Sequence, residues 1–266
     1  MKLKFWKICF FILAFLSFGA ALYFFLKTKM VRNTDQITFL SSSELQAVLD
    51  EDADQYYKTF NKVDLKLRKS KNLKEYLARI SNSGSEGAEE SKEKIMDCIQ
   101  RINRKLEDII GGGEEKVIVG IDLRKFLDMP WRIGFTGNTL YEHGLPHTRD
   151  GVIIINNRDV EKRNISQMCR LLIHEKVHVY QKVFKTEFAQ YLERTYEKTP
   201  KGKNNEIPAN PDTDRFVYTD KTTGQILQGK YRDNPSHFRD IDFTDDDHTK
   251  EHPNELVAYT LEDLYE

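Results

Sequence analysis

The segment His174-Glu175-Lys176-Val177-His178 combines the residue types that a metal-dependent hydrolase uses. Side chains four residues apart lie on one face of a helix, so the imidazoles of His174 and His178 can bind one ion. Glu175 lies off the line between them, so its carboxylate can reach a water molecule on the ion without becoming a ligand. Two neutral imidazoles and one carboxylate suit Zn²⁺, with a fourth position left for water. The spacing therefore predicts one Zn²⁺ per chain, with Glu175 taking a proton as the water attacks a carbonyl.

A third protein ligand is expected downstream, on another element. We choose Glu255, which begins a predicted helix as Asn254-Glu255-Leu256-Val257-Ala258. The small side chain of Ala258, one turn later, permits this helix to pack closely on the first. A glutamate in a first turn also suits the helix dipole without any metal. Three histidines of the approach segment are the alternative ligands: His237, His248 and His252.

The motif HEKVH followed by a downstream NExxA resembles the gluzincin branch of the zincin metallopeptidases. The resemblance implies that His174, His178 and Glu255 hold Zn²⁺, that Glu175 is the general base, and that the substrate is a peptide or protein. A larger set of segments, YEHGLPHT, GVIII, HEKVHVYQ, NPD and HPNELVAY, is similar to uncharacterised zinc peptidases of large DNA viruses and some microbes. This similarity spans about residues 131–266. The metzincin pattern HExxHxxGxxH is absent, because Gln181 stands where that pattern requires glycine.

The resemblance also assigns expectations to the cleft. In zincins an edge strand borders the cleft and pairs with extended substrate, and Gly151–Ile155 is the strand expected here. Gluzincins stabilise the oxyanion with a Tyr or His that follows the ligands, and this chain offers Tyr231, His237, His252 and Tyr259. His143 and His147 precede the strand. Each is a candidate for a substrate or oxyanion contact, or for a hydrogen bond within a turn.

The spacing of apolar residues along the chain predicts the helices and strands that carry these residues. Segregated helices and strands predict an α+β fold. Helices are expected at about 41–60, 65–80, 88–110, 165–184 and from 253, and strands at 117–119, 131–136 and 151–155. Gly111-Gly112-Gly113 predicts a boundary between a connector and helical region, 28–115, and a zincin-like catalytic domain, 116–266. We expect the helices to brace the catalytic domain, and residues 200–253 to form a loop-rich segment.

The start of the chain predicts a membrane anchor, residues 1–27. From Ile8 to Leu26 there is no charged residue, and this run is about long enough to cross a bilayer. Three basic residues stand on each side, Lys2, Lys4 and Lys7 before the run and Lys27, Lys29 and Arg32 after it, so charge does not set the orientation of the anchor. We expect a single-pass membrane protein. The alternative is a cleaved signal peptide and a secreted protein.

Composition excludes several other classes. The chain has 41 Lys+Arg against 42 Asp+Glu, so no general attraction to nucleic acid is expected. Three cysteines in 266 residues exclude a disulfide scaffold, and whether Cys98 and Cys169 pair stays open. Two functions compete with a membrane-anchored zinc peptidase. One is an inactive HExxH fold that serves as a binding module, and the other is a membrane-tethered helical scaffold with incidental histidines.

Overall fold

The structure is a computed structural model that describes residues 36–113, 117–200 and 206–265. The chain forms two compact units, Met1–Thr38 and Phe39–Glu266. The predicted anchor, residues 8–26, lies outside the described residues. Within the described ranges, no helix combines the length and apolar character needed to cross a membrane. The boundary predicted near residue 115 falls inside the second unit, so the described residues on both sides of it belong to one compact unit.

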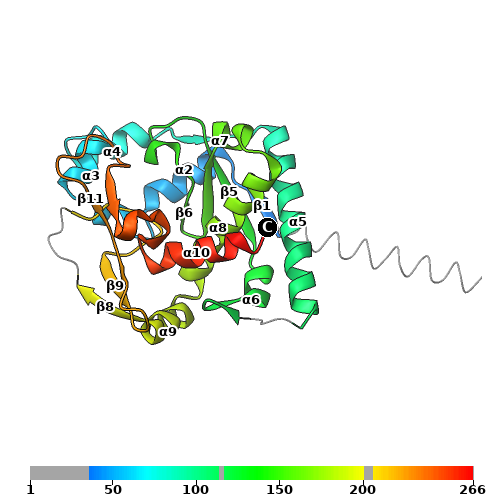
Figure 1. Ribbon diagram of the computed structural model, residues 1–266. Helices are drawn as coiled ribbons and strands as arrows, with labels where there is room; N and C mark the ends of the chain where they lie inside the picture. Colours follow the sequence, from blue (N-terminus) through cyan, green and yellow to red (C-terminus); the bar gives the residue numbers. More distant parts are fainter. Residues whose placement is uncertain (1–35, 114–116, 201–205, 266) are drawn as a thin grey trace, which may run out of the picture. The chain divides into compact units, whose positions relative to one another are not determined.

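The architecture is mixed α+β, as predicted (Figure 1). The α-helices of the described residues are α2 (Ser42–Glu51), α3 (Lys62–Leu67), α4 (Leu73–Ile80), α5 (Glu89–Gly111), α6 (Leu123–Asp128), α7 (Asn157–Lys162), α8 (Ile165–Val183), α9 (Lys185–Thr195) and α10 (Pro253–Asp263). Short 3₁₀-helices are η1 (Tyr56–Thr59), η2 (Glu142–Gly144), η3 (Thr244–Asp246) and η4 (His248–Lys250). The strands are β1 (Ile37–Phe39), β2 (Gly84–Ser85), β3 (Val117–Ile118), β4 (Ile121–Asp122), β5 (Trp131–Thr136), β6 (His147–Arg149), β7 (Val152–Asn156), β8 (Tyr196–Pro200), β9 (Phe216–Asp220), β10 (Ile226–Leu227), β11 (Gly229–Tyr231) and β12 (Ile241–Phe243).

The main sheet places β7 between β5 and β6. β5 and β7 run parallel, with Ile133 opposite Ile153, and β6 pairs with β7 antiparallel. On the far edge of β5, β2 pairs antiparallel and Leu40 donates its N–H to Ile133 O at 2.8 Å. The strand predicted to border the cleft, Gly151–Ile155, is therefore an interior strand, and β6 is the edge. The strong β-branched run of β7 is buried throughout, which is the pattern of an interior strand.

The helical region packs directly on this sheet. Leu45 and Leu49 of α2 are fully buried, and Gly134 of β5 gives Leu45 the space it needs. A Cβ at Gly134 would lie only 2.7 Å from a Leu45 methyl carbon. Arg149 of β6 reaches back to this region and pairs with Asp52 and Asp54, both at 2.7 Å. These contacts support the expected bracing role.

The predicted helix over 65–80 is instead two helices, α3 and α4. Asn61 and Asn72 are the reason, because each caps a separate helix with its side-chain oxygen. Between the helices, Lys69 takes a φ of 52°, which ends the first one. The predicted stripe over 41–60 is likewise divided, into α2 and η1. Capping residues, rather than the spacing of apolar residues, therefore decide where α3 and α4 begin.

The long segment after α9 is more ordered than its composition predicts. Strands β8, β9 and β10 form a three-stranded antiparallel sheet, and β11 and β12 form a hairpin. Tyr231 of this hairpin donates its hydroxyl to Asp64 at 2.9 Å, which fixes the hairpin against α3. Long-range contacts of this kind leave no periodic signal in the sequence.

Helix α8 lies at the centre of the second unit, against α5 and α10 (Figure 1). Asn164 begins it with a capping box that includes Gln167. Ala258 is fully buried, consistent with the close packing expected of α10. Cys98 of α5 and Cys169 of α8 are both buried and free. A hydrogen bond between their thiols, and then burial, raise the pKa of Cys98.

Candidate metal centre

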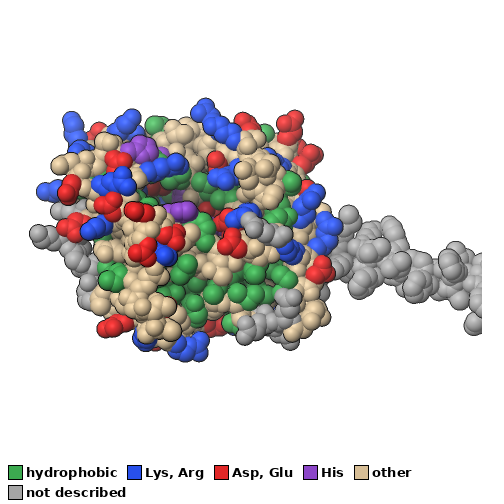
Figure 2. Space-filling view, in the orientation of Figure 1, with side chains coloured by type: hydrophobic (Ala, Val, Ile, Leu, Met, Phe, Trp, Pro, Cys, Tyr) green, Lys and Arg blue, Asp and Glu red, His purple; other side chains and the backbone are tan. Residues whose placement is uncertain are grey.

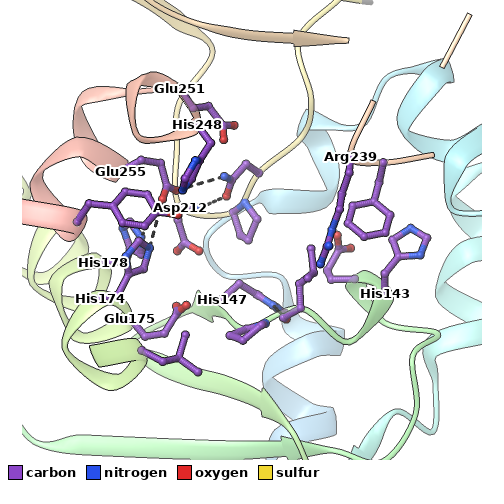
Figure 3. A pocket seen from close by; sticks show the side chains of 18 of the residues that line it. His143, His147, His174, Glu175, His178, Asp212, Arg239, His248, Glu251 and Glu255 are labelled. Atoms are coloured by element: carbon purple, nitrogen blue, oxygen red, sulfur yellow. Dashed lines mark hydrogen bonds and ion pairs between the residues drawn. The ribbon is translucent and has the colours of Figure 1, made fainter. Parts of the chain in front are cut away.

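His174, His178 and Glu255 bring one ligand atom each to a common region. These atoms all lie within 4.8 Å of one another. His174 Nε2 is 3.3 Å from Glu255 Oε2, and His178 Nε2 is 3.7 Å from the same oxygen. Figure 3 shows the three side chains converging from α8 and α10. We call these three residues the ligand cluster.

Local structure explains why Glu255 arrives there. His252 caps α10 with its side chain, and Pro253 occupies the first helical position, where a missing N–H costs nothing. Glu255 is therefore in the first turn, 8% exposed, and aimed at α8. Asn210 donates to its second oxygen at 3.3 Å. One carboxylate oxygen is thus held by Asn210, and the other faces the imidazoles.

The imidazoles are oriented by groups that sequence reasoning missed. His178 Nδ1 lies 2.9 Å from Gln181 Oε1, while Gln181 Nε2 donates to Asn254 O at 3.0 Å. Because the amide nitrogen is already a donor, Gln181 Oε1 accepts and His178 Nδ1 carries the proton. The Nε2 lone pair then faces Glu255. An i, i+3 glutamine is a weak sequence signal, since helices bear many of them.

Glu262 lies next to Nδ1 of His174, as Gln181 lies next to Nδ1 of His178. Its Oε2 lies 3.3 Å from His174 Nδ1, and Arg170 holds its other oxygen at 2.9 Å. Glu262 lies on α10, two turns after Glu255. A carboxylate behind a ligating imidazole sets the ring orientation and raises the basicity of the other nitrogen.

The charges of the ligand cluster attract a cation. Burial opposes protonation of His174, but hydrogen bonds to Glu255 and Glu262 and their charges raise its pKa to about 10. Burial also opposes protonation of His178, but the negative charges of Asp212 and Glu255 outweigh it and raise the pKa of His178. Burial would raise the pKa of Glu255, yet the two histidines hold it well below its usual value. Protons on the imidazoles therefore occupy the electrostatic place that a divalent ion would take.

Glu175 stands beside the ligand cluster without belonging to it. It is 4% exposed, and Thr148 Oγ1 lies 3.2 Å from its Oε2 and 3.1 Å from its backbone oxygen. Burial and then the charge of Asp212 raise the pKa of Glu175 to about 7. A carboxyl with that pKa can accept and return a proton near neutral pH. The predicted division of roles within the motif fits this geometry.

The turn Asn210-Pro211-Asp212 connects the site to the edge strand. Asp212 accepts the Thr148 N–H at 3.2 Å and pairs with Lys182 at 2.8 Å. Lys182 also donates to Thr148 O. The N–H and C=O of Thr148 are therefore both occupied by side chains. Beyond the turn itself, the sequence carries no signal for this arrangement.

A cavity of about 880 Å³ opens beside the ligand cluster. Figure 2 shows histidine, acidic and basic side chains around a hollow on this face. Four of the predicted contact residues line the cavity: His143, His147, Tyr231 and Tyr259. His248, an alternative ligand, also lines it but is not in the ligand cluster.

Two predicted contact residues are not among those that line the cavity. His252 is a buried helix cap whose Nε2 lies 3.0 Å from Asp214. His237 is exposed, and its N–H donates to Asp240 at 2.8 Å. Among the oxyanion candidates, Tyr259 lies beside the ligand cluster, with its ring 4.7 Å from that of His174. Tyr231 uses its hydroxyl on Asp64 instead.

Comparison with known proteins gives no match. No protein-family model, no curated protein and no solved structure is similar to this chain. A function for the site is therefore argued from its own geometry.

Proposed function

We propose that this chain is a zinc-dependent metallopeptidase, tethered to a membrane through residues 8–26. The observation that carries the proposal is the convergence of His174, His178 and Glu255 next to a buried carboxylate, at the wall of a large cavity. Two imidazoles and one carboxylate are the protein ligands of catalytic zinc sites that keep one position open. The anchor stays a prediction from the sequence.

The donor set supports zinc over other common ions. Ca²⁺ and Mg²⁺ prefer six or more oxygen ligands, whereas here two of the three donors are imidazole nitrogens. The partners Gln181 and Glu262 leave both Nε2 atoms available, as metal-ligating histidines require. When bound, Zn²⁺ would polarise a scissile carbonyl and lower the pKa of a water molecule.

The residues of the chain divide the remaining work. Glu175 takes a proton from the attacking water and can return it to the leaving amine, because its raised pKa favours both directions. Thr148 orients that carboxylate through its hydroxyl. The cavity wall beyond Glu175 accommodates the peptide. Tyr259 is the residue best placed to donate to a developing oxyanion, since it lies beside His174.

The test combines metal analysis with cleavage of fluorescent casein by purified full-length protein. We expect one zinc per chain. Glu175→Gln should keep the zinc and lower the cleavage rate by about 10²- to 10⁴-fold, the usual contribution of a general base. Glu187→Gln is the matched control, because Glu187 is an exposed carboxylate on α9 that pairs with Lys125. Zinc without any cleavage would favour the inactive binding module, and no zinc would favour the scaffold.

A further inference from the structure

The wall of the cavity across from the ligand cluster carries an unpaired cation. Figure 3 shows Arg239 reaching into the cavity on the side of His143 and His147, away from His174, His178 and Glu255. Arg239 lies in the turn between β11 and β12. No carboxylate in the described part of the chain forms an ion pair with it, and its nearest aromatic contact is Phe238, at 5.5 Å.

Two imidazoles of the same wall each have one nitrogen without a partner. His143 is stacked on Phe238, with ring centroids 4.2 Å apart and planes 14° apart. Its buried Nε2 makes no hydrogen bond to any described residue, and the same holds for Nε2 of His147. His147 is 4% exposed. Buried polar atoms without partners are costly, so a site that contains them is suited to a polar ligand.

The other charges of this wall are already neutralised. Glu142 forms an ion pair with Arg68 at 2.5 Å, and its carboxylate accepts hydrogen bonds from the hydroxyls of Tyr56 and Tyr76 at 3.0 and 2.6 Å. Arg68 is therefore occupied by Glu142. Arg239 is left to set the charge that this wall presents, whereas the opposite wall carries Glu175, Glu255 and Glu262. The cavity is thus polarised from acidic to basic.

The edge strand β6 offers a bound peptide few free backbone hydrogen-bonding groups. Both backbone groups of Thr148 are taken by Asp212 and Lys182, so β6 has lost a pair of groups that could bind an added strand. Side chains must then supply more of the orientation of a peptide. Arg239 is suited to this role, because its planar guanidinium can bind both oxygens of a carboxylate.

We propose that Arg239, supported by His143, forms a carboxylate subsite that selects the substrate. This inference rests on the proposed peptidase function and names its substrate class: peptides with a carboxylate some distance from the scissile bond. The carboxylate belongs either to the C-terminus or to an Asp or Glu side chain. A phosphate with two negative charges fits less well. A single guanidinium would balance only one of these charges, and the carboxylates of the opposite wall would repel the other.

The experiment measures peptide binding by calorimetry to full-length protein carrying Glu175→Gln, which prevents cleavage during the titration. Three pools of acetylated hexapeptides of Ala and Leu serve as probes. The first has a C-terminal amide, the second a free C-terminus, and the third an amide with one Glu at each position in turn. Arg239→Gln is compared with Arg232→Gln on the same hairpin. Arg232 is 59% exposed by its side chain, pairs with Asp242 and does not line the cavity.

We expect one carboxylate pool to bind about 10- to 100-fold more tightly than the neutral pool. Arg239→Gln should remove this preference, and Arg232→Gln should keep it. Preference for the second pool identifies a C-terminal carboxylate, and preference for the third identifies an acidic side chain. Equal binding of all pools, no binding, or a preference that survives Arg239→Gln would overturn the subsite. Because no cleavage is measured, failure of the peptidase assignment is seen separately in the casein assay.

Discussion

Two buried charged clusters contribute residues to the wall of the same cavity, and they differ in how their polar atoms are satisfied. The ligand cluster consists of His174, His178 and Glu255. The second, which we call the Glu142 cluster, consists of Glu142, Arg68, Tyr56 and Tyr76. In the Glu142 cluster donors meet acceptors, and Arg68 contacts both oxygens of Glu142.

In the ligand cluster, by contrast, acceptors would face each other unless the imidazoles carried added protons. Each Nε2 faces a carboxylate oxygen, and each opposite nitrogen already lies next to Gln181 or Glu262. Such an arrangement is stable only if protons or a cation enter it. The difference teaches that burial of charge alone does not mark a functional site. A satisfied network indicates structure, and converging lone pairs indicate a ligand.

The largest effect should follow from removing one ligand. We expect His178→Ala to abolish stoichiometric zinc binding, because even outer partners of a ligand contribute about 10- to 100-fold in affinity. Competition with a chromophoric chelator measures this affinity. His237→Ala is the control, since His237 is exposed and outside the ligand cluster. Equal affinities for the two variants would contradict the assignment.

Breaking the Glu142 cluster should affect stability instead. Glu142→Gln leaves Arg68 buried without its main counter-charge, and we expect a loss of about 3–5 kcal/mol in the free energy of unfolding. Urea denaturation of the zinc-free protein gives this value. The exposed Glu187→Gln should change stability by less than about 0.5 kcal/mol. A loss that small for Glu142→Gln would show that the cluster is dispensable.

The ion pair between Glu142 and Arg68 also predicts that the stability of the fold depends on pH. Burial would raise the pKa of Glu142, but the charge and hydrogen bonds of Arg68 outweigh it and lower the pKa to about 2. An unfolded Glu titrates near pH 4.3, at about the reference value. Because the folded pKa is depressed, its stabilisation is present above the unfolded pKa and is lost as pH falls from about 4.3 to 2. The stability difference between wild type and Glu142→Gln should shrink over this range, and a constant difference would argue against the pair.

A smaller effect is expected from the support of the ligand cluster. Gln181→Ala frees the proton-bearing nitrogen of His178, and zinc affinity should fall by about 10- to 100-fold while the ligands remain. The chelator assay used for His178→Ala applies. Gln225→Ala, which removes a half-buried glutamine hydrogen-bonded to Asp245 outside the ligand cluster, provides the reference. If Gln181 only packs α8 against α10, stability will change and zinc affinity will not.

Elements with a strong local pattern were predicted closely. The strand Trp131–Thr136 has the predicted bounds, and α8 ends one residue before the predicted end. The role of β7 was predicted incorrectly, because an apolar run shows that a strand is buried but not which strands flank it. Lys176, inside the motif, is 1% exposed and lies 4.0 Å from the centre of the Trp131 ring. No neighbouring residue in the sequence indicates that burial.

The HExxH spacing already required His174 and His178 to share one helical face, because a helical turn is set by local backbone hydrogen bonds. It also placed Glu175 beside that face. Glu255 could be chosen from the sequence, but its approach to the two imidazoles, the edge position of β6 and the contribution of Gln181 needed the folded chain. Those features depend on contacts between residues distant in sequence, such as Gln181 with Asn254, whose formation is decided by the packing of whole helices rather than by neighbouring residue types.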